Sequence, residues 1–190
     1  MGFFNWAAPV FHRFANRWSE DHISEIADLL RPYAGQEARL LDLGGGTGAL
    51  AVRLADALPA TVTVLDPAPE MLRYLPQHER VTGLVGVAES LPFPDGSFDL
   101  AVVSDAFHHF RDQDGAVAQI ARVLRPGGAL FILDYDPDAI RFIVWAERVL
   151  GEPAAFFRPA DLCTYLAQRG VSGTCVPTSA RSYYFLGEKG

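Results

Sequence analysis

The residues most able to do chemistry gather first in a glycine-rich segment, RLLDLGGGTGAL, at residues 39–50. Leucines surround Asp42, three glycines follow from Gly44, and Gly48 precedes a stretch of helical character. This order is typical of a buried strand, a tight turn and a helix N-terminus, where free N–H groups favour negative ligand groups. Asp66 comes about twenty residues after the glycines, where an acid accepts both hydroxyls of a ribose. The first hypothesis is a cofactor site.

A second group of reactive side chains lies in the segment SDAFHHF at residues 104–110. Histidine can take a proton near neutral pH, and a neighbouring acid can hold its tautomer. Asp105, His108 and His109 are therefore candidates for a general base. The alternative is structural, with one histidine packed beneath the loop and its ring nitrogen satisfied by a hydrogen bond.

Strands and helices alternate around these two groups. We expect strands at 40–43, 61–65, 81–85, 100–104 and 129–134, and helices near 49–58, 69–75, 113–124 and 138–149. Such alternation predicts an α/β fold, a doubly wound sheet with helices on both faces. In such sheets ligands bind outside the carboxyl ends of the strands. Both reactive groups fall at that edge.

The two ends of the chain extend this core. After a helix at 160–170, strands at 171–177 and 181–187 are joined by three residues, too few for a parallel crossover, so they must form an antiparallel hairpin. Residues 3–34 are expected to be helical, with Ser19 as a cap. The predicted fold is thus a mostly parallel seven-stranded sheet in one domain, 1–190, with a helical cover at 1–35 and a core at 36–187.

Composition excludes several classes of function. A formal net charge of −7 over 190 residues argues against a nucleic-acid partner. Cys163 and Cys175 lack metal-ligand spacing, so we expect free buried thiols and no metal site. No apolar run is long enough to span a membrane, and the first residues lack the basic start of a signal peptide. A cytoplasmic enzyme is the expectation.

The glycine pattern alone leaves the cofactor open, because Gly44-x-Gly46-x-x-Ala49 also fits a dinucleotide fingerprint. Three further features favour another cofactor: ESLPFPDGSFD at 89–99, LRPGG at 124–128, and the terminal hairpin. With them, residues 36–187 resemble the class I S-adenosylmethionine-dependent methyltransferases, in particular the small-molecule branch with ubiquinone/menaquinone-type enzymes. A nicotinamide oxidoreductase is the weaker alternative, since the only lysine is Lys189 and no Tyr-x-x-x-Lys pair exists.

The resemblance implies roles for individual residues and S-adenosylmethionine as the cofactor. One position departs from the family pattern: many relatives have an acid where this chain has Val87, and Glu89 is the nearest replacement. The implied cofactor-binding residues are Asp42, Gly44, Gly46 and Gly48 around the methionine part, Asp66 at the ribose, Pro67 and Met71 beside the adenine, Ala88 and Glu89 at its edge, and Ser104, with Asp105, beside the methionyl amino group.

The expected activity is methyl transfer by in-line displacement to a small, apolar or aromatic molecule. The segments that can cover the site are rich in aromatic residues, namely Phe3, Phe4, Trp6, Phe142, Trp145, Phe156 and Phe157. A site left open by these segments would be completed by a second subunit, so a homodimer is also expected. The alternative function is that of a cofactor-binding protein without transfer activity, which works through interaction or regulation.

Overall fold

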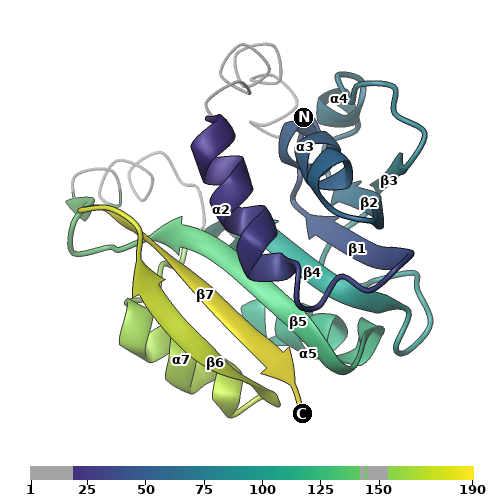
Figure 1. Ribbon diagram of the computed structural model, residues 1–190. Helices are drawn as coiled ribbons and strands as arrows, with labels where there is room; N and C mark the ends of the chain where they lie inside the picture. The colour runs from purple at the N-terminus through teal and green to yellow at the C-terminus, as the bar shows by residue number, and fades with distance from the viewer. Residues whose placement is uncertain (1–18, 142–143, 145–153) are drawn as a thin grey trace.

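A seven-stranded sheet in the order β3-β2-β1-β4-β5-β7-β6 forms the middle layer of the protein (Figure 1). The structure is a computed structural model that describes residues 19–141, 144 and 154–190. Strands β1 to β5 pair in parallel, and β7 is antiparallel to both β5 and β6. The predicted sheet and its C-terminal hairpin are confirmed. The strands are β1 (Ala38–Leu43), β2 (Ala60–Asp66), β3 (Val81–Val85), β4 (Phe98–Ser104), β5 (Leu124–Tyr135), β6 (Val171–Pro177) and β7 (Ser182–Lys189).

Helices cover both faces of this sheet, as Figure 1 shows. Residues of α2 and α3 belong to one buried apolar cluster, and residues of α5 and α7 belong to the other. The two clusters follow from the pleat, because successive side chains of a strand point to opposite faces. In β1, for example, Leu40 lies in the α3 cluster and Leu41 in the α5 cluster. The helices are α2 (Glu20–Leu30), α3 (Ala49–Ala57), α4 (Pro69–Leu72), α5 (Gln113–Val123) and α7 (Pro159–Ala167), with a 3-10 turn η2 at Phe107–His109.

Helix α2 begins where the sequence predicts. The Ser19 hydroxyl accepts a hydrogen bond from the His22 N–H, which satisfies one of the unpaired donors of the first turn. Ile23, Ile26 and Leu30 then point into the core at helical spacing. Residues 3–18 of the expected helical cover lie outside the described residues.

Three expected boundaries are wrong, and the first is that of α7, which ends at Ala167 and not at Gly170. Helix α4 ends at Leu72 and not near residue 75. Pro76 disfavours helical backbone at Leu75, the residue before it. The Leu75 N–H donates to the Leu72 carbonyl, an i→i−3 bond and not the i→i−4 bond of an α-helix. Strand β5 already begins at Leu124, so LRPGG belongs to the strand. It bulges there: β4 advances from Phe98 to Leu100 while β5 advances from Leu124 to Ala129.

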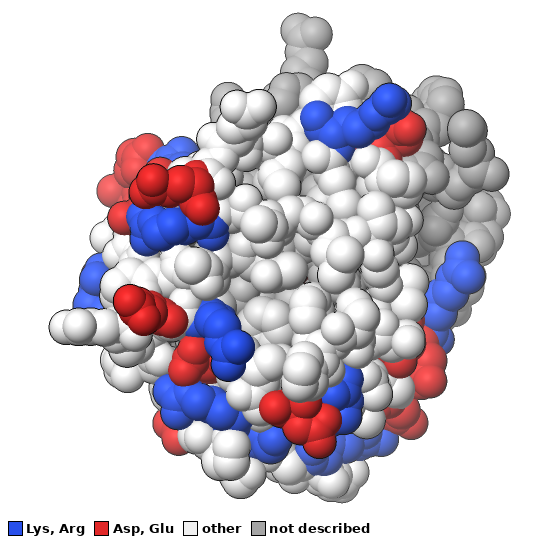
Figure 2. Space-filling view, turned by 90° about the vertical axis from the view of Figure 1, so that its right-hand side faces the viewer, with Lys and Arg blue, Asp and Glu red and all other residues white. Residues whose placement is uncertain are grey.

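The β3 edge of the sheet is apolar and exposed. Figure 2 views this side, and its middle is uncharged, with acidic and basic side chains interspersed toward its margins. Three of the four large apolar side chains exposed among the described residues, Leu84, Val85 and Val87, lie in or directly after β3. Val87, which stands where many relatives have an acid, is thus a surface residue.

Candidate functional site

The glycine loop after β1 lies at the carboxyl edge of the sheet, beside the ends of β2 and β4. Gly44, Gly46 and Gly48 all have positive φ angles, of 69°, 57° and 72°. This left-handed backbone is open to glycine at little cost but strained for other residues. The loop is also packed closely, because a Cβ on Gly44 would lie 2.6 Å from the Cβ of Ala106 in the loop after β4. The two reactive groups of the sequence therefore meet at Gly44 and Ala106.

Gly44→Ala will destabilise the protein by roughly 2–4 kcal/mol, since it combines left-handed strain with a steric clash against Ala106. Gly127→Ala is the matched control: Gly127 has a φ of 70°, but a Cβ there meets nothing within 4 Å. The control should lose only about 1–2 kcal/mol. Urea unfolding of both variants measures the difference in the free energy of unfolding. Equal losses would show that Ala106 moves away from the new Cβ without destabilising the protein.

The N–H groups of the loop are used internally. Gly44 donates to the Leu65 carbonyl at 2.8 Å, and Gly48 donates to the Gly45 carbonyl at 2.9 Å. Gly46 donates to the Asp66 carboxylate at 2.8 Å. The sequence led us to expect free N–H groups here for a negative ligand group. These three glycines do not supply them, because the tight turn already pairs their donors.

Asp66 joins the glycine loop to the start of α4. Its carboxylate is buried and accepts the N–H groups of Gly46 and Ala68, both at 2.8 Å. Burial raises the pKa of Asp66, and the two N–H donors oppose that rise. Each carboxylate oxygen still has a second lone pair, so the group can accept two hydroxyl donors. This arrangement suits the role in ribose binding that we expect for Asp66.

Asp42 lies beneath the same loop without a hydrogen-bond partner among the described residues. Both carboxylate oxygens are buried, and a Cβ on Gly45 would lie 2.4 Å from Oδ2. The neighbours of Asp42 in the sheet are the apolar residues Val64 and Val102. Burial, and then the charge of Asp66, raise the pKa of Asp42 to about 7. A buried, unpaired carboxylate is costly, and a cation over the loop would offset that cost.

The residues expected near the adenine differ in their surroundings. Met71 is buried, and its Cε would lie 2.9 Å from a Cβ on Gly46. Pro67 is exposed, while Ala88 is buried in the α5 cluster. The Glu89 carboxylate accepts the N–H groups of Arg111, at 2.9 Å, and Asp112. Glu89 thus anchors the segment before α5, and its contact with adenine stays a prediction.

Ser104 ends β4 at the same edge, and Asp105 follows it. Asp105 has a φ of 51°, an uncommon backbone region for a residue other than glycine that aspartate tolerates better than most. Its N–H donates to the Leu133 carbonyl of β5 at 2.9 Å, which fixes the turn. The Ser104 hydroxyl lies 3.4 Å from Asp105 Oδ2.

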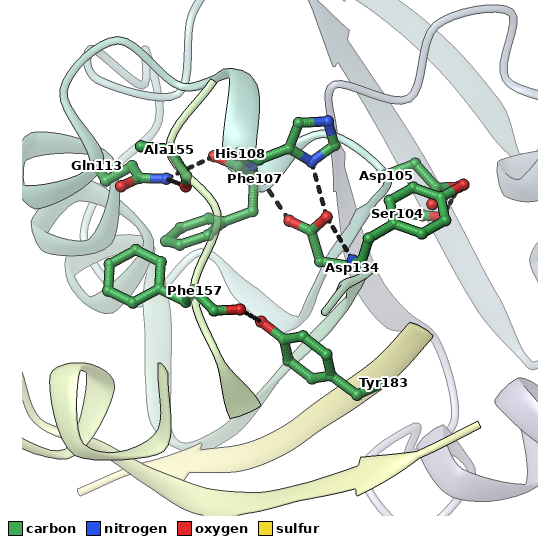
Figure 3. Close-up of polar contacts among 10 residues, drawn as sticks. Ser104, Asp105, Phe107, His108, Gln113, Asp134, Ala155, Phe157 and Tyr183 are labelled. Carbon is green, nitrogen blue, oxygen red and sulfur yellow. Dashed lines mark hydrogen bonds and ion pairs between the residues drawn. The ribbon is translucent and has the colours of Figure 1, made fainter. Parts of the chain in front are cut away.

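Asp134, the second-last residue of β5, is a buried acid beside the candidate His108 that sequence reasoning did not single out. It is buried, and its Oδ1 lies 2.7 Å from Nδ1 of His108 (Figure 3). The sequence did offer a signal for Asp134, because it is an acid near the carboxyl end of β5, the strand beside β4. His109, the other histidine candidate, is held neutral, because burial and then the neighbouring His108 lower its pKa to about 4.

The two thiols also meet. Cys163 of α7 and Cys175 of β6 are free and half-buried, with their Sγ atoms 2.7 Å apart. The sequence predicts separate buried thiols, so the half-burial and the mutual contact are corrections. They arise because α7 packs against β6.

No helix in the described ranges is long and apolar enough to cross a membrane. The expectation of a cytoplasmic enzyme stays a prediction.

Known proteins resemble this chain in sequence and in fold. Residues 41–132 match the family model of a methyltransferase domain. A demethylmenaquinone methyltransferase of Thermus thermophilus is 37% identical over 123 residues, 59% of this chain and 56% of that protein. A ubiquinone/menaquinone biosynthesis C-methyltransferase of Shewanella halifaxensis is 33% identical over 145 residues, 68% of this chain and 58% of that protein. The chain therefore spans little more than half the length of these relatives.

Solved structures extend the likeness in fold to the whole chain. A SAM-dependent methyltransferase from Thermotoga maritima has a TM-score of 0.76 at 21% identity, with 98% of each chain covered. A chain from the complex of the Haloferax volcanii Trm112 methyltransferase activator with a methyltransferase has a TM-score of 0.83 at 18% identity, covering 100% of this chain and 98% of that one. Residues 41–132 are thus similar to a methyltransferase domain, and the chain has the fold of solved methyltransferases.

Proposed function

We propose that this protein transfers a methyl group from S-adenosylmethionine to a small, apolar or aromatic molecule by in-line displacement. The observation that carries the proposal is the buried carboxylate of Asp42 beneath the glycine loop, which has no hydrogen-bond partner among the described residues. S-adenosylmethionine brings two positive groups, its ammonium and its sulfonium, to such a loop. A nicotinamide cofactor would instead bring a negatively charged pyrophosphate to the glycine loop above Asp42, which that carboxylate would repel.

The residues fit the donor in a consistent order along the edge of the sheet. Asp42 would attract the positive methionyl part, and Asp66 would accept the ribose hydroxyls. Met71 and Ala88 would border the adenine, and Ser104 would lie toward the amino group. When bound, the donor supplies a methyl group already activated on sulfur. The protein then needs chiefly to align the acceptor with that methyl group, which can contribute roughly 7–11 kcal/mol.

Aromatic side chains in and around the turn after β4 support an apolar or aromatic acceptor. The ring of Phe107 contacts those of Phe110 and Phe157, and the ring of Phe156 stacks on His108 with centroids 4.2 Å apart. The other aromatic residues expected to cover the site lie outside the described residues. The relatives named for ubiquinone and menaquinone biosynthesis point the same way, toward an aromatic quinol-type acceptor. The homodimer stays a prediction, which the sedimentation mass of the free protein will check.

Calorimetry with S-adenosylhomocysteine, the demethylated donor, tests the cofactor. We expect binding of this ligand, and no binding of NADH under the same conditions. Incubation with S-adenosylmethionine and 1,4-dihydroxynaphthalene, followed by mass spectrometry, then tests transfer, with a monomethylated product expected. A protein that binds S-adenosylhomocysteine but methylates no member of a panel of quinols, phenols and amines would support the alternative, a binding protein without transfer activity.

A further inference from the structure

Three N–H groups converge on the buried carboxylate of Asp134. The His108 backbone N–H lies 3.2 Å from Oδ2, while His108 Nδ1 and the Tyr135 N–H lie 2.7 and 2.8 Å from Oδ1. Two backbone N–H groups already donate to this carboxylate, so a neutral His108 ring would complete the set by carrying its proton on Nδ1. The other ring nitrogen, Nε2, is then unprotonated and points away from Asp134 (Figure 3).

The ring of His108 is held rigidly in this orientation. Phe156 stacks on it with an interplanar angle of 15°, and the His108 carbonyl accepts the Ala155 N–H at 2.8 Å. The Gln113 side-chain amide donates to the carbonyls of Phe107 and Ala155, at 3.0 and 2.8 Å, which ties the two segments together. A fixed base costs little reorganisation when it accepts a proton.

The position of His108 relates it to the cofactor loop. His108 lies two residues after Ala106, the residue that a Cβ on Gly44 would strike. Asp134 is the second-last residue of β5, the strand adjacent to β4. Of the two histidine candidates, His109 is the poorer proton acceptor, since burial and the neighbouring His108 lower its pKa to about 4. The geometry therefore separates two histidines that are adjacent in the sequence.

We infer that Asp134 positions His108 so that Nε2 accepts a proton from the methyl acceptor, which makes His108 the catalytic base and Asp134 a positioning residue. This inference rests on the proposed function. It assigns the acceptor to molecules that lose a proton on methylation, such as phenols and quinols. The acceptor gives its hydroxyl proton to Nε2 and an electron pair to the methyl carbon, while the S–CH3 bond breaks and leaves its pair on the sulfur, which loses its positive charge.

The tautomer of His108 tests the dyad without any turnover. Long-range ¹H–¹⁵N NMR of the protein with S-adenosylhomocysteine should show Nδ1–H and an unprotonated Nε2, with the signal assigned by its loss in His108→Asn. In Asp134→Asn the new amide can donate to Nδ1, so the Nε2–H tautomer should replace the original one. A wild-type His108 that carries its proton on Nε2 would overturn the inference.

Kinetics test the proton transfer. His108→Asn keeps a side-chain N–H for Asp134 and removes Nε2, and it should lower kcat with 1,4-dihydroxynaphthalene by roughly 10²–10⁴-fold at pH 7 while the affinity for S-adenosylhomocysteine stays within about twofold. His78→Asn is the matched control, because His78 also contacts a carboxylate, that of Asp56, at 3.1 Å. His78 precedes the amino end of β3, whereas the candidate site lies at the carboxyl ends of the strands. Wild-type turnover in His108→Asn would overturn the inference, whereas failure of the wild-type protein to bind S-adenosylhomocysteine would overturn the proposed function instead.

Discussion

Asp42→Asn will make the free protein more stable at pH 8 and will weaken its binding of S-adenosylhomocysteine. The amide removes a buried charge that has no hydrogen-bond partner among the described residues, and it also removes the attraction for the positive methionyl group. We expect the thermal midpoint to rise by roughly 5–10 °C at pH 8. The affinity should fall by roughly 10–100-fold, a loss of about 1.4–2.8 kcal/mol. Scanning fluorimetry and calorimetry measure the two effects.

The pH dependence has a defined sign. The folded protein holds the Asp42 proton more tightly than the unfolded chain does, because the pKa is raised from 3.8 to about 7. This contribution to stability is complete below about pH 4 and is lost as the pH rises to about 7, on the order of 4 kcal/mol in all. The advantage of Asp42→Asn should therefore shrink between pH 8 and pH 5. Affinity of the wild-type protein for S-adenosylhomocysteine should fall over the same range, because Asp42 becomes neutral.

Asp99→Asn is the control with the opposite sign. Burial alone would raise the pKa of Asp99, but the Arg39 N–H and the Arg125 guanidinium hold it below the usual value. Asp99 lies at the start of β4, away from the cofactor edge, so its variant should lose stability at pH 8 and keep the affinity for S-adenosylhomocysteine. If Asp42→Asn also lost stability at pH 8, the carboxylate would have a partner in solution and its role as a cation site would fail.

Asp66→Ala will abolish binding of S-adenosylhomocysteine. The substitution removes the acceptor for two ribose hydroxyls and releases the Gly46 and Ala68 N–H groups that shape the loop. Hydrogen bonds to a charged group contribute about 1.5–3 kcal/mol each, so two of them amount to a loss of roughly 10²–10⁴-fold in affinity. Calorimetry measures the affinity, and circular dichroism of the free variant confirms that it is folded.

Glu89→Ala is the matched control for Asp66→Ala. Glu89 also accepts two backbone N–H groups, those of Arg111 and Asp112, so both variants lose the same kind of loop anchor. Glu89→Ala should nevertheless weaken the affinity much less, by about tenfold or under, because its carboxylate is already committed to the segment before α5. Equal losses in the two variants would show that loop anchoring, and not ribose recognition, accounts for the effect of Asp66.

The sequence by itself determined the architecture. The alternation of apolar strands with helices predicts the parallel sheet, the three-residue connection predicts the hairpin, and the glycines predict the tight turn. These features are local, because strand pleat, helix periodicity and the steric freedom of glycine depend on residues close in the chain. Local reasoning failed where a long-range contact decides the boundary, as in the bulge that places Leu124 at the start of β5.

Only the tertiary structure decided the chemistry of the site. His108 and His109 are equivalent in the sequence, but the pairing of β4 with β5 brings Asp134, 26 residues away, onto His108 alone. The same holds for Asp42, whose burial between Val64 and Val102 raises its pKa to about 7. The physical reason is that hydrogen-bond partners and local dielectric are set by neighbours in space. The sequence thus named residues at the edge of the sheet. The fold gave His108 a partner, Asp134, and left Asp42 without a hydrogen-bond partner among the described residues.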